Sequence, residues 1–392
     1  MASEAKATRK IPFFKATIGE EEIASVVETL KSGWLTTGPK VKTFESKFAE
    51  FVGTEHAVAV NSATAGLHLS LESLGIGPGD EVLVPTMTFA ATAEVVIHLG
   101  ANPILVDCKP DNLNICVDNM RLKRTAKTKA IIPVLYGGHA CQMNEIHEFA
   151  KQHTLAVIED AAHAFPAKYE ERKIGSLSDV TCFSFYANKT ITTGEGGMCT
   201  TNDAELAARI RQMSLHGLSR SAWNRFSAKG SWYYEIEAPG YKYNMADTAA
   251  AIGIGQLEKA ENFLVQRTRV AERYTEGLKD VEEIELLDVS KNVQHSWHLF
   301  VIKLKLESLT IDRSDFIVKL NESGIGTSVH YTPLHLHPLY QKQYGYQESD
   351  LPNASQVFQQ IISLPIFASM TNEDVDYVVQ MIKRIVSDHK KP

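Results

Sequence analysis

The sequence predicts an α/β protein with a large domain on a mainly parallel sheet and a smaller α+β domain at its C-terminal end. In the first two-thirds of the chain, short apolar runs alternate with stretches of helical periodicity, and the runs are apolar at nearly every position. Strands with two apolar faces are typical of parallel sheets that helices cover on both sides. The length of 392 residues exceeds what one ordinary core organises, which favours two domains.

The expected elements follow in order along the chain. Strands are expected at residues 56–62, 81–86, 102–107, 129–136, 155–160 and 181–186. Helices are expected at residues 64–75, 88–100 and 144–153. A long helical pattern begins near Gln256 and should link the domains, and the rest of the chain mixes strand and helix. We therefore expect an N-terminal arm at 1–12, a large domain at 13–258 and a small domain at 259–392.

Composition excludes several classes of protein. The hydrophobic fraction of 44% and charged fraction of 22% are typical of a soluble globular protein. A net charge of −7 leaves no basic surplus for nucleic acid, and no apolar run approaches the roughly 20 residues of a membrane helix. The first ten residues lack the apolar segment of a secretory signal. The odd number of cysteines, five with no CxxC pair, fits reduced thiols in a cytoplasmic protein.

Chemistry is expected where the strands end. In open parallel sheets, ligands bind beyond the carboxyl ends of the strands. The segments 62–64, 86–89, 160–163 and 184–189 directly follow four of the expected strands. We therefore expect these segments to converge on one crevice.

Lys189 is the first candidate in this crevice. It lies among small and hydroxyl residues with no carboxylate before Glu195, and a glycine-rich turn follows. An amine at the ligand-binding edge can lose its solvent, which disfavours its charged form, and a neutral amine can form a Schiff base with an aldehyde. Taken alone, a lysine beside glycines is more often structural.

Asp160 strengthens the functional interpretation of Lys189. It ends the apolar run LAVIE, and a buried carboxylate needs a partner because an unpaired buried charge is costly. A protonated pyridine nitrogen would be such a partner, as in pyridoxal phosphate (PLP) enzymes. A helix N-cap would also explain the position of Asp160. It explains less well the lysine at a second strand end.

A phosphate site is expected between the first strand and its helix. Small and hydroxyl residues fill this turn, and backbone N–H groups at a helix start bind phosphate. The turn is neither a Walker loop nor GxGxxG, and helix capping by Ser62 or Thr64 is compatible with the same pattern. Ser184 offers a second hydroxyl, and Phe89 could stack on an aromatic ring.

The order of these signals resembles a known family. The strings IEDAAHA, SFYANKTITTGEGG and GYKYNMADTAAAIGIGQLEK look like the DegT/DnrJ family of PLP-dependent aminotransferases, which act on nucleotide-linked keto sugars. The similarity extends through SGWLTTGPKVKTFE, HSWHLFVIKL, GIGTSVHYTPLH and SLPIFASMT, from about Ile11 onward. It implies a fold type I aminotransferase with a mainly parallel seven-stranded sheet. It also implies a homodimer with shared active sites.

The resemblance implies roles for particular residues. Lys189 would be the Schiff-base and proton-transfer residue, and Asp160 would pair with the pyridine nitrogen. His163 would lie near the cofactor's phenolic oxygen and Phe89 would stack on the ring. The phosphate would be held by Thr64, Ala65 and Ser184. Asn244 would reach the phosphate of the neighbouring subunit's cofactor.

Residues for the sugar are less clearly marked. The resemblance places the segment TTGPK, with Thr36, over the sugar, although an ordinary turn explains it as well. His330 and Tyr331 are candidates for lining the sugar pocket. Tyr136 and His139 could also approach the substrate, and its identity would depend further on Trp34 and Arg225. The pairs in HSWH and HLH do not predict a metal, because no carboxylate or cysteine has a suitable spacing.

The reaction implied is a ping-pong transfer of an amino group from L-glutamate to a nucleotide-linked keto-deoxy sugar. Carbon 4 of a UDP-4-keto-6-deoxy sugar is favoured by the strings NSATAG, EDAAHA and GYKYN. Relatives that dehydrate their substrate have histidine in place of the lysine, so Lys189 favours transamination. The alternatives are a C3 sugar aminotransferase, a PLP-dependent sugar dehydratase and a non-catalytic PLP-binding regulator.

Overall fold

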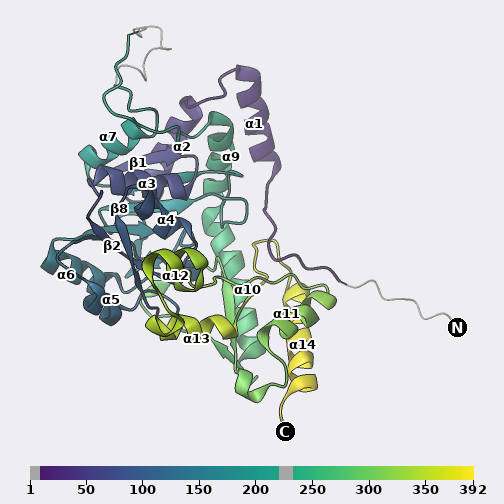
Figure 1. The fold of residues 1–392 in the computed structure, drawn as a ribbon. Helices are drawn as coiled ribbons and strands as arrows, with labels where there is room; N and C mark the ends of the chain where they lie inside the picture. Colours follow the sequence, from purple (N-terminus) through teal and green to yellow (C-terminus); the bar gives the residue numbers. More distant parts are fainter. Residues whose placement is uncertain (1–8, 220–232) are drawn as a thin grey trace.

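The computed structural model describes residues 9–219 and 233–392 and is built on a seven-stranded sheet (Figure 1). The strand order is β1-β9-β8-β5-β4-β2-β3. Only β9 runs antiparallel to its neighbours, so the expected mainly parallel sheet is confirmed. The strands are β1 (His56–Val60), β2 (Glu81–Pro85), β3 (Asn102–Val106), β4 (Thr128–Ile131), β5 (Ala156–Asp160), β8 (Val180–Ser184) and β9 (Gly197–Thr201).

Helices cover both faces of this sheet, and each face has its own apolar core. Alternate residues of β1 divide between the two cores, because successive side chains of a strand point to opposite faces. Ala57 and Ala59 join one core, whereas Val58 and Val60 join the other. The first core also takes residues from α2 (Pro39–Val52), α5 (Val117–Lys123), α6 (Met143–His153) and α9 (Asp247–Glu258). The second takes residues from α3 (Ala63–Ser73), α4 (Ala91–His98) and α7 (Ala204–Met213).

The C-terminal part has a third core around an antiparallel sheet of order β10-β12-β13. Helix α10 contributes buried residues at helical spacing, among them Val270, Tyr274 and Leu278. The N-terminal arm also joins this core through Ile11, whose N–H donates to the Gly324 carbonyl over 2.8 Å. The elements are α10 (Ala260–Leu278), β10 (Ile284–Leu286), β12 (Phe300–Leu304), α11 (Arg313–Glu322), β13 (Ile361–Leu364) and α14 (Asn372–His389).

The remaining elements attach to these cores (Figure 1). Helix α1 packs against α9. Helix α12 lies beside the large sheet, where Leu334, Tyr340 and Leu351 enter the second core. The division at residue 258 stays a prediction, and this segment shows that part of 259–392 packs on the large domain. These elements are α1 (Glu20–Ser32), β6 (Lys168–Tyr169), β7 (Arg172–Lys173), β11 (Val293–Gln294), α12 (Pro338–Tyr344) and α13 (Pro352–Gln360).

Two expected elements differ from the structure. Strand β4 ends at Ile131 and does not extend to 136, because Pro133 has no N–H to donate to a neighbouring strand. The linking helix is two helices, since α9 begins at Asp247 and α10 follows a break at Lys259. The first part of α9 was not expected to be helical because it consists largely of small residues. The structure shows why they are small: α9 packs closely, and a Cβ on Gly253 would lie 2.7 Å from Cζ of Phe44.

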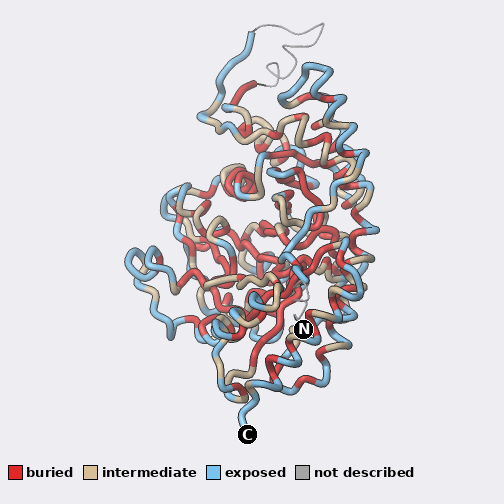
Figure 2. Tube along the Cα trace, turned by 90° about the vertical axis from the view of Figure 1, so that its right-hand side faces the viewer, coloured by how far each residue is buried: buried red, intermediate tan, exposed pale blue. Residues whose placement is uncertain are grey.

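Burial follows this layered arrangement, with buried segments in the interior and exposed segments on the outside (Figure 2). Across 9–219 and 233–392, no helix combines the length and the apolar character that crossing a membrane requires.

Candidate active site

A cavity of about 500 Å³ lies where β1, β2, β5 and β8 end. The segments that follow these four strands all contribute to its walls, and so does a segment from the C-terminal part. Its lining includes Ser62, Thr64, Phe89, Asp160, His163, Ser184, Lys189, His330 and Tyr331. The structure therefore brings together most of the residues that the sequence analysis selected.

Lys189 is positioned by the turn that follows β8. Its backbone N–H donates to the Tyr186 carbonyl over 3.0 Å, and the turn closes through a bridge between Tyr186 and Gly194. Gly194 has a φ of +81°, which a side chain would disfavour. Burial lowers the pKa of the Lys189 amine to about 8, although the charge of Asp160 acts in the opposite direction. About a tenth of the amine is therefore neutral at pH 7, far more than for an ordinary lysine, and the neutral form is the nucleophile.

Asp160 ends β5, and its carboxylate is almost fully buried, with 6% of the residue exposed. The hydroxyl of Thr92 donates to Oδ2 over 2.8 Å, and the N–H of Ala162 donates to Oδ1 over 3.1 Å. Burial raises the pKa of Asp160 despite these hydrogen bonds and the nearby Lys189 amine. A cationic group in the cavity would therefore favour the ionised carboxylate.

His163 lies deeper in the same wall, and its hydrogen bonds assign its tautomer. The N–H of Gly137 donates to Nδ1 over 3.3 Å, so Nδ1 is an acceptor and the ring proton belongs to Nε2. Nε2 lies 2.9 Å from the hydroxyl of Tyr331. Burial, with smaller contributions from Lys189 and His330, lowers the pKa of His163 well below its usual range. The ring is therefore a neutral hydrogen-bonding group.

The start of α3, called the cradle below, lines the cavity with Ser62, Ala63 and Thr64, and phosphate binding there stays a prediction. Ser62 is its N-cap, and the Ser62 hydroxyl accepts the N–H of Ala65 over 3.0 Å. The other N–H groups of the first turn have no partner within the helix and can meet an anion. Gly197 on β9 lies directly beneath this turn, since a Cβ there would be 2.5 Å from the carbonyl carbon of Ser62. Gly197, which belongs to the glycine-rich sequence, thus allows β9 to approach the cradle closely.

Phe89 extends into the cavity from the segment after β2. It is 62% exposed, whereas a lone Phe after a strand is usually part of the core. Its ring lies 6.0 Å from that of Tyr331 at an angle of 50°. An exposed aromatic surface beside a carboxylate and an amine suits a planar aromatic ligand.

Two residues expected at the sugar are also tied to other groups. Tyr331 contacts His163, as described, and His330 Nδ1 lies 2.8 Å from the hydroxyl of Ser363. Both line the cavity, so a role toward the sugar stays a prediction. Thr36 is exposed and does not line the cavity, and Trp34 is likewise outside it. Arg225 lies outside the described residues.

Tyr136 and His139, which were also expected near the substrate, do not line this cavity, so their approach to a substrate stays a prediction. Both line a separate cavity of about 270 Å³ between the domains. The hydroxyl of Tyr136 donates to the His330 carbonyl, and a 3₁₀ turn spans Tyr136–Gly138. No group of three or more metal-ligating side chains occurs within 9–219 and 233–392. His335 of the HLH segment is buried and bonded to Thr86 and Ser355.

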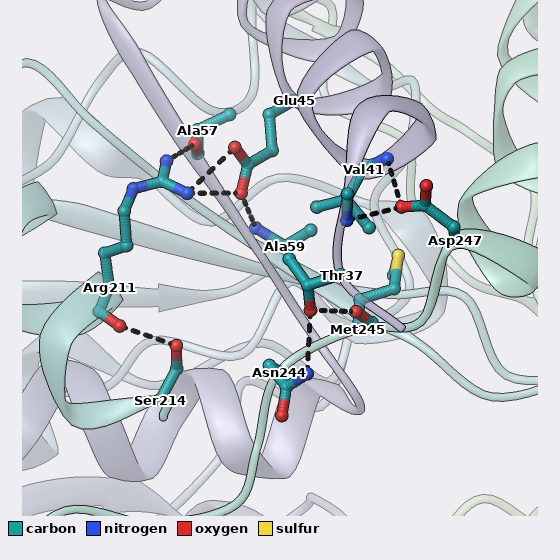
Figure 3. A network of polar contacts seen from close by, with 11 residues as sticks. Thr37, Val41, Glu45, Ala57, Ala59, Arg211, Ser214, Asn244, Met245 and Asp247 are labelled. Carbon is teal, nitrogen blue, oxygen red and sulfur yellow. Dashed lines mark hydrogen bonds and ion pairs between the residues drawn. The ribbon is translucent and has the colours of Figure 1, made fainter. Parts of the chain in front are cut away.

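Asn244 lies outside the cavity of its own chain. Its amide donates to the hydroxyl of Thr37 over 2.7 Å, and Thr37 donates to the Met245 carbonyl over 2.6 Å (Figure 3). The same region holds the N-terminus of α2, where the carboxylate of Asp247 accepts the N–H of Val41 over 3.0 Å (Figure 3). Asn244 is thus well ordered by its neighbours without touching the groups around Lys189.

A larger open hollow of about 1140 Å³ lies between α2, β1 and α7. Its main charges neutralise one another, because Arg211 pairs with both carboxylate oxygens of Glu45 at 2.9 Å and bonds the Ala57 carbonyl (Figure 3). Glu45 also accepts the N–H of Ala59. Since these groups are satisfied within the fold, the smaller cavity at the strand ends is the candidate site.

Three residues of the site were missed by the sequence analysis. Thr92 supports Asp160, and Thr88 lies 2.8 Å from the Thr92 hydroxyl. Asn188 precedes Lys189, lines the cavity and has a buried Oδ1 without a hydrogen-bond partner among the described residues. Thr92 gave no signal because it lies within a helix, whereas Thr88 and Asn188 lie in the segments 86–89 and 184–189 that were expected at the crevice. Asn188 could have been found from its place beside Lys189.

The residues present fit pyridoxal phosphate. The cradle at α3 suits its phosphate, and the buried carboxylate of Asp160 suits a cationic ring nitrogen. The lowered pKa of Lys189 makes its amine easier to deprotonate for reaction with the aldehyde. Phe89 offers a face to the ring, and His163 offers a neutral polar edge. No single feature is specific, but all five line one cavity.

Comparison with known proteins agrees with this arrangement. The model of the DegT/DnrJ/EryC1/StrS aminotransferase family matches residues 16–383, so the chain belongs to this family and its class is that of sugar aminotransferases. Spore coat polysaccharide biosynthesis protein SpsC of Bacillus subtilis is 48% identical over 377 residues, covering 96% of this chain and 97% of SpsC. Protein MJ1066 of Methanocaldococcus jannaschii is 50% identical over 380 residues, covering 97% of this chain and 98% of that protein.

Among solved structures, Spr1654 of Streptococcus pneumoniae, assigned as a sugar aminotransferase, superposes with a TM-score of 0.90 at 35% identity. The match covers 97% of this chain and 98% or 99% of the two Spr1654 chains, which are described as its PMP form and its PLP form. The expectations of an aminotransferase fold, an enzyme and a PLP cofactor are confirmed at the level of the family.

Proposed function

We propose that this protein transfers an amino group from L-glutamate to a nucleotide-linked keto-deoxy sugar, with carbon 4 of a UDP-4-keto-6-deoxy sugar as the acceptor. The observation that supports transamination most directly is the pair Lys189 and Asp160. They stand at the ends of the adjacent strands β8 and β5 and line one cavity with the anion cradle of α3. The choice of sugar and carbon rests on similarity to the C4-aminating branch alone.

Each residue of the site has its own role in the proposed reaction. Bound PLP supplies an aldehyde for the amino group and a ring that accepts electrons. Lys189 would provide the amine for the aldehyde and, when free, would move a proton to or from the substrate carbon. Asp160 stabilises positive charge at the ring nitrogen, and Thr92 keeps its carboxylate oriented. Thr64 and Ser184 would hold the phosphate, whereas Ala65, also expected there, is outside the cavity lining and donates its N–H to Ser62. His163 would lie beside the ring's polar edge with its Nε2 already in contact with the Tyr331 hydroxyl.

We further propose that the enzyme is a homodimer with shared sites. Among the described residues that line the cavity, Lys189 is the only lysine or arginine, yet glutamate brings two carboxylates. A partner subunit can supply the missing positive charge, and Asn244 would reach the partner's phosphate. Helix α1 presents Ile23, Val27 and Leu30, each at least 41% exposed, as an apolar stripe for such a contact.

A cytoplasmic location is proposed as well. All five cysteines lie in the described part of the chain and all are free thiols. Reduced thiols are expected in that compartment.

A substrate panel tests the function. The purified protein is incubated with L-glutamate and with UDP-, dTDP- and GDP-linked keto sugars, and product masses are measured. A UDP-4-amino-6-deoxy product supports the proposal. A C3-amino product or a dehydrated sugar identifies one of the alternative enzymes, and cofactor colour without any product indicates a regulator.

Subunit complementation tests the shared site. K189A and N244A protomers, each inactive or impaired in its own homodimer, are mixed under mild denaturation and refolded. If Asn244 acts across the interface, the heterodimer has one intact site and regains activity. Activity no greater than the average of the two homodimers would contradict a shared site.

A further inference from the structure

We propose that His298 is a positioning residue that holds the His163 ring in place from the side of the small domain. The inference rests on the proposed PLP site, in which His163 is a polar neighbour of the cofactor. His298 lies in the HSWH segment, to which the sequence analysis assigned no function. Its ring centroid lies 4.4 Å from that of His163, with an angle of 41° between the rings.

The segment that carries His298 is bound tightly to the turn beside His163. The N–H of Ser296 donates to the Gly138 carbonyl and the N–H of Leu299 donates to the Gly137 carbonyl, each over 3.0 Å. The Ser296 hydroxyl donates to the backbone carbonyl of His163 over 2.7 Å. The approach is so close that a Cβ on Gly138 would lie 2.1 Å from the Ser296 hydroxyl. The backbone around His298 thus has little freedom to move relative to His163.

The same segment is anchored on its far side. Trp297, next to His298, has a φ of +53°, and its carbonyl accepts a hydrogen bond from the buried guanidinium of Arg267 over 3.0 Å. Arg267 also donates to the Ile366 carbonyl over 3.1 Å. His298 is therefore held between the core of the C-terminal part and the wall of the candidate active site.

The contact determines how His163 can be oriented. His163 accepts from the Gly137 N–H at Nδ1 and meets the Tyr331 hydroxyl at Nε2. These two bonds leave the ring free to rotate about the line that joins the two nitrogens, and the His298 ring, 4.4 Å away, limits that rotation by contact. His298 is 5% exposed, and its Nδ1 has no hydrogen-bond partner within 9–219 and 233–392. Its present contribution is therefore ring contact and not a hydrogen bond from Nδ1.

The charged and titratable groups that face the two rings favour neutrality. Lys189, His330, Tyr331 and Tyr136 surround His163, and Arg267 lies behind His298. Burial is the main cause that lowers the pKa of both histidines, and Lys189 adds to it. Two neutral imidazoles in contact act as a rigid packing unit.

The experiment compares three variants in the full-length protein. H298A removes the ring, H298F keeps a ring without nitrogen, and H295A removes a nearby imidazole that stacks on Trp297 and has no ring contact with His163. The first readout is the ¹⁵N spectrum of histidine-labelled protein without cofactor, with H163N to assign the signals. The second is the binding of PLP and the pH titration of its visible band.

We expect the wild type, H298F and H295A to show His163 as the neutral Nε2–H tautomer. H298A should show averaged or protonated His163 signals. It should also bind PLP about fivefold more weakly, as expected if the misplaced His163 ring loses one hydrogen bond. Its titration midpoint should move by about 0.5 pH unit or more.

Three results would overturn the inference: H298A behaves like the wild type, H298F is as perturbed as H298A, or H295A is as perturbed as H298A. A wild type that binds no PLP would refute the proposed function instead, and the ¹⁵N spectra would still decide the role of His298. Thermal unfolding of each variant separates a general loss of stability from displacement of His163.

Discussion

The hydroxyl of Thr92, on α4, donates a 2.8 Å hydrogen bond to Oδ2 of Asp160 at the end of β5. This bond joins two elements that are distant in sequence, and it favours the ionised form of a carboxylate whose pKa burial raises. In the proposed role, Asp160 must be ionised to stabilise a cationic ring nitrogen, so we expect Thr92 to act on the cofactor through Asp160.

The variant T92V should therefore weaken PLP binding. A hydrogen bond to a charged group contributes about 1.5–3 kcal/mol, so we expect a rise in Kd of roughly tenfold or more. Kd is measured from the visible absorbance of the protein titrated with PLP. T200V is the matched control, because the buried Thr200 hydroxyl bonds the Gly175 carbonyl away from the cavity. Equal Kd values for T92V and T200V would contradict this role.

Replacing Asp160 with Asn should change stability in opposite directions with and without cofactor. The folded-state pKa of Asp160 is raised, so the folded protein binds the proton more tightly than the unfolded chain does. Stability of the apo protein therefore falls as pH rises from about 4 through the raised pKa, and D160N removes this loss. At pH 7 we expect a higher Tm than wild type in the apo form and a smaller Tm increase on adding PLP. A lower apo Tm for D160N across the pH range would count against this assignment.

The lowered pKa of Lys189 predicts how fast the apo protein takes up PLP. Only the neutral amine attacks an aldehyde, and its fraction rises about tenfold per pH unit below its pKa. With a pKa of about 8, the uptake rate should rise with pH and level off above that value. Stopped-flow absorbance measures the rate. A rate that keeps rising to pH 10 would show that Lys189 has an ordinary pKa.

The variant K189R should give no visible band and lose roughly 10²–10⁴-fold in turnover.

Gly197 should be intolerant of a side chain because it supports the anion cradle. The added Cβ of G197A would lie 2.5 Å from the carbonyl carbon of Ser62, so β9 or the start of α3 must move. We expect a loss of about 1–3 kcal/mol of stability in urea unfolding, together with weaker PLP binding. G77A is the control, since a Cβ at Gly77 meets nothing within 4 Å. Unchanged PLP binding in G197A would separate Gly197 from the cradle.

Phe89 should matter for the cofactor and little for folding. It is 62% exposed, so F89A should leave the free energy of unfolding of the apo protein within about 0.5 kcal/mol of wild type. If the ring stacks on PLP, F89A should speed PLP release and shift the visible band. L122A, at a residue 82% exposed and outside the cavity, should alter neither property. A large loss of apo stability in F89A would mean that the ring is part of the core.

The contacts that orient Asp160 and His163 could not be predicted from the sequence. The bond from Thr92 to Asp160, the bond between Tyr331 and His163, and the ring contact of His298 each join elements far apart in sequence. Local periodicity carries no information about such pairs, because they depend on how helices and domains pack. Tyr136 and His139 illustrate the same point, because they follow a strand in sequence yet line another cavity together with residues of the C-terminal part.

The sequence by itself determined the sheet, its helices and the edge at which Lys189, Asp160 and the α3 cradle meet. It did so because apolar runs without alternation define parallel strands, and parallel strands bring their carboxyl ends to one edge. Only the tertiary structure decided that burial raises the pKa of Asp160 and lowers that of Lys189, and which side chains oppose these shifts or orient His163. Those properties come from burial and from side chains on other elements, and both exist only after the chain has packed.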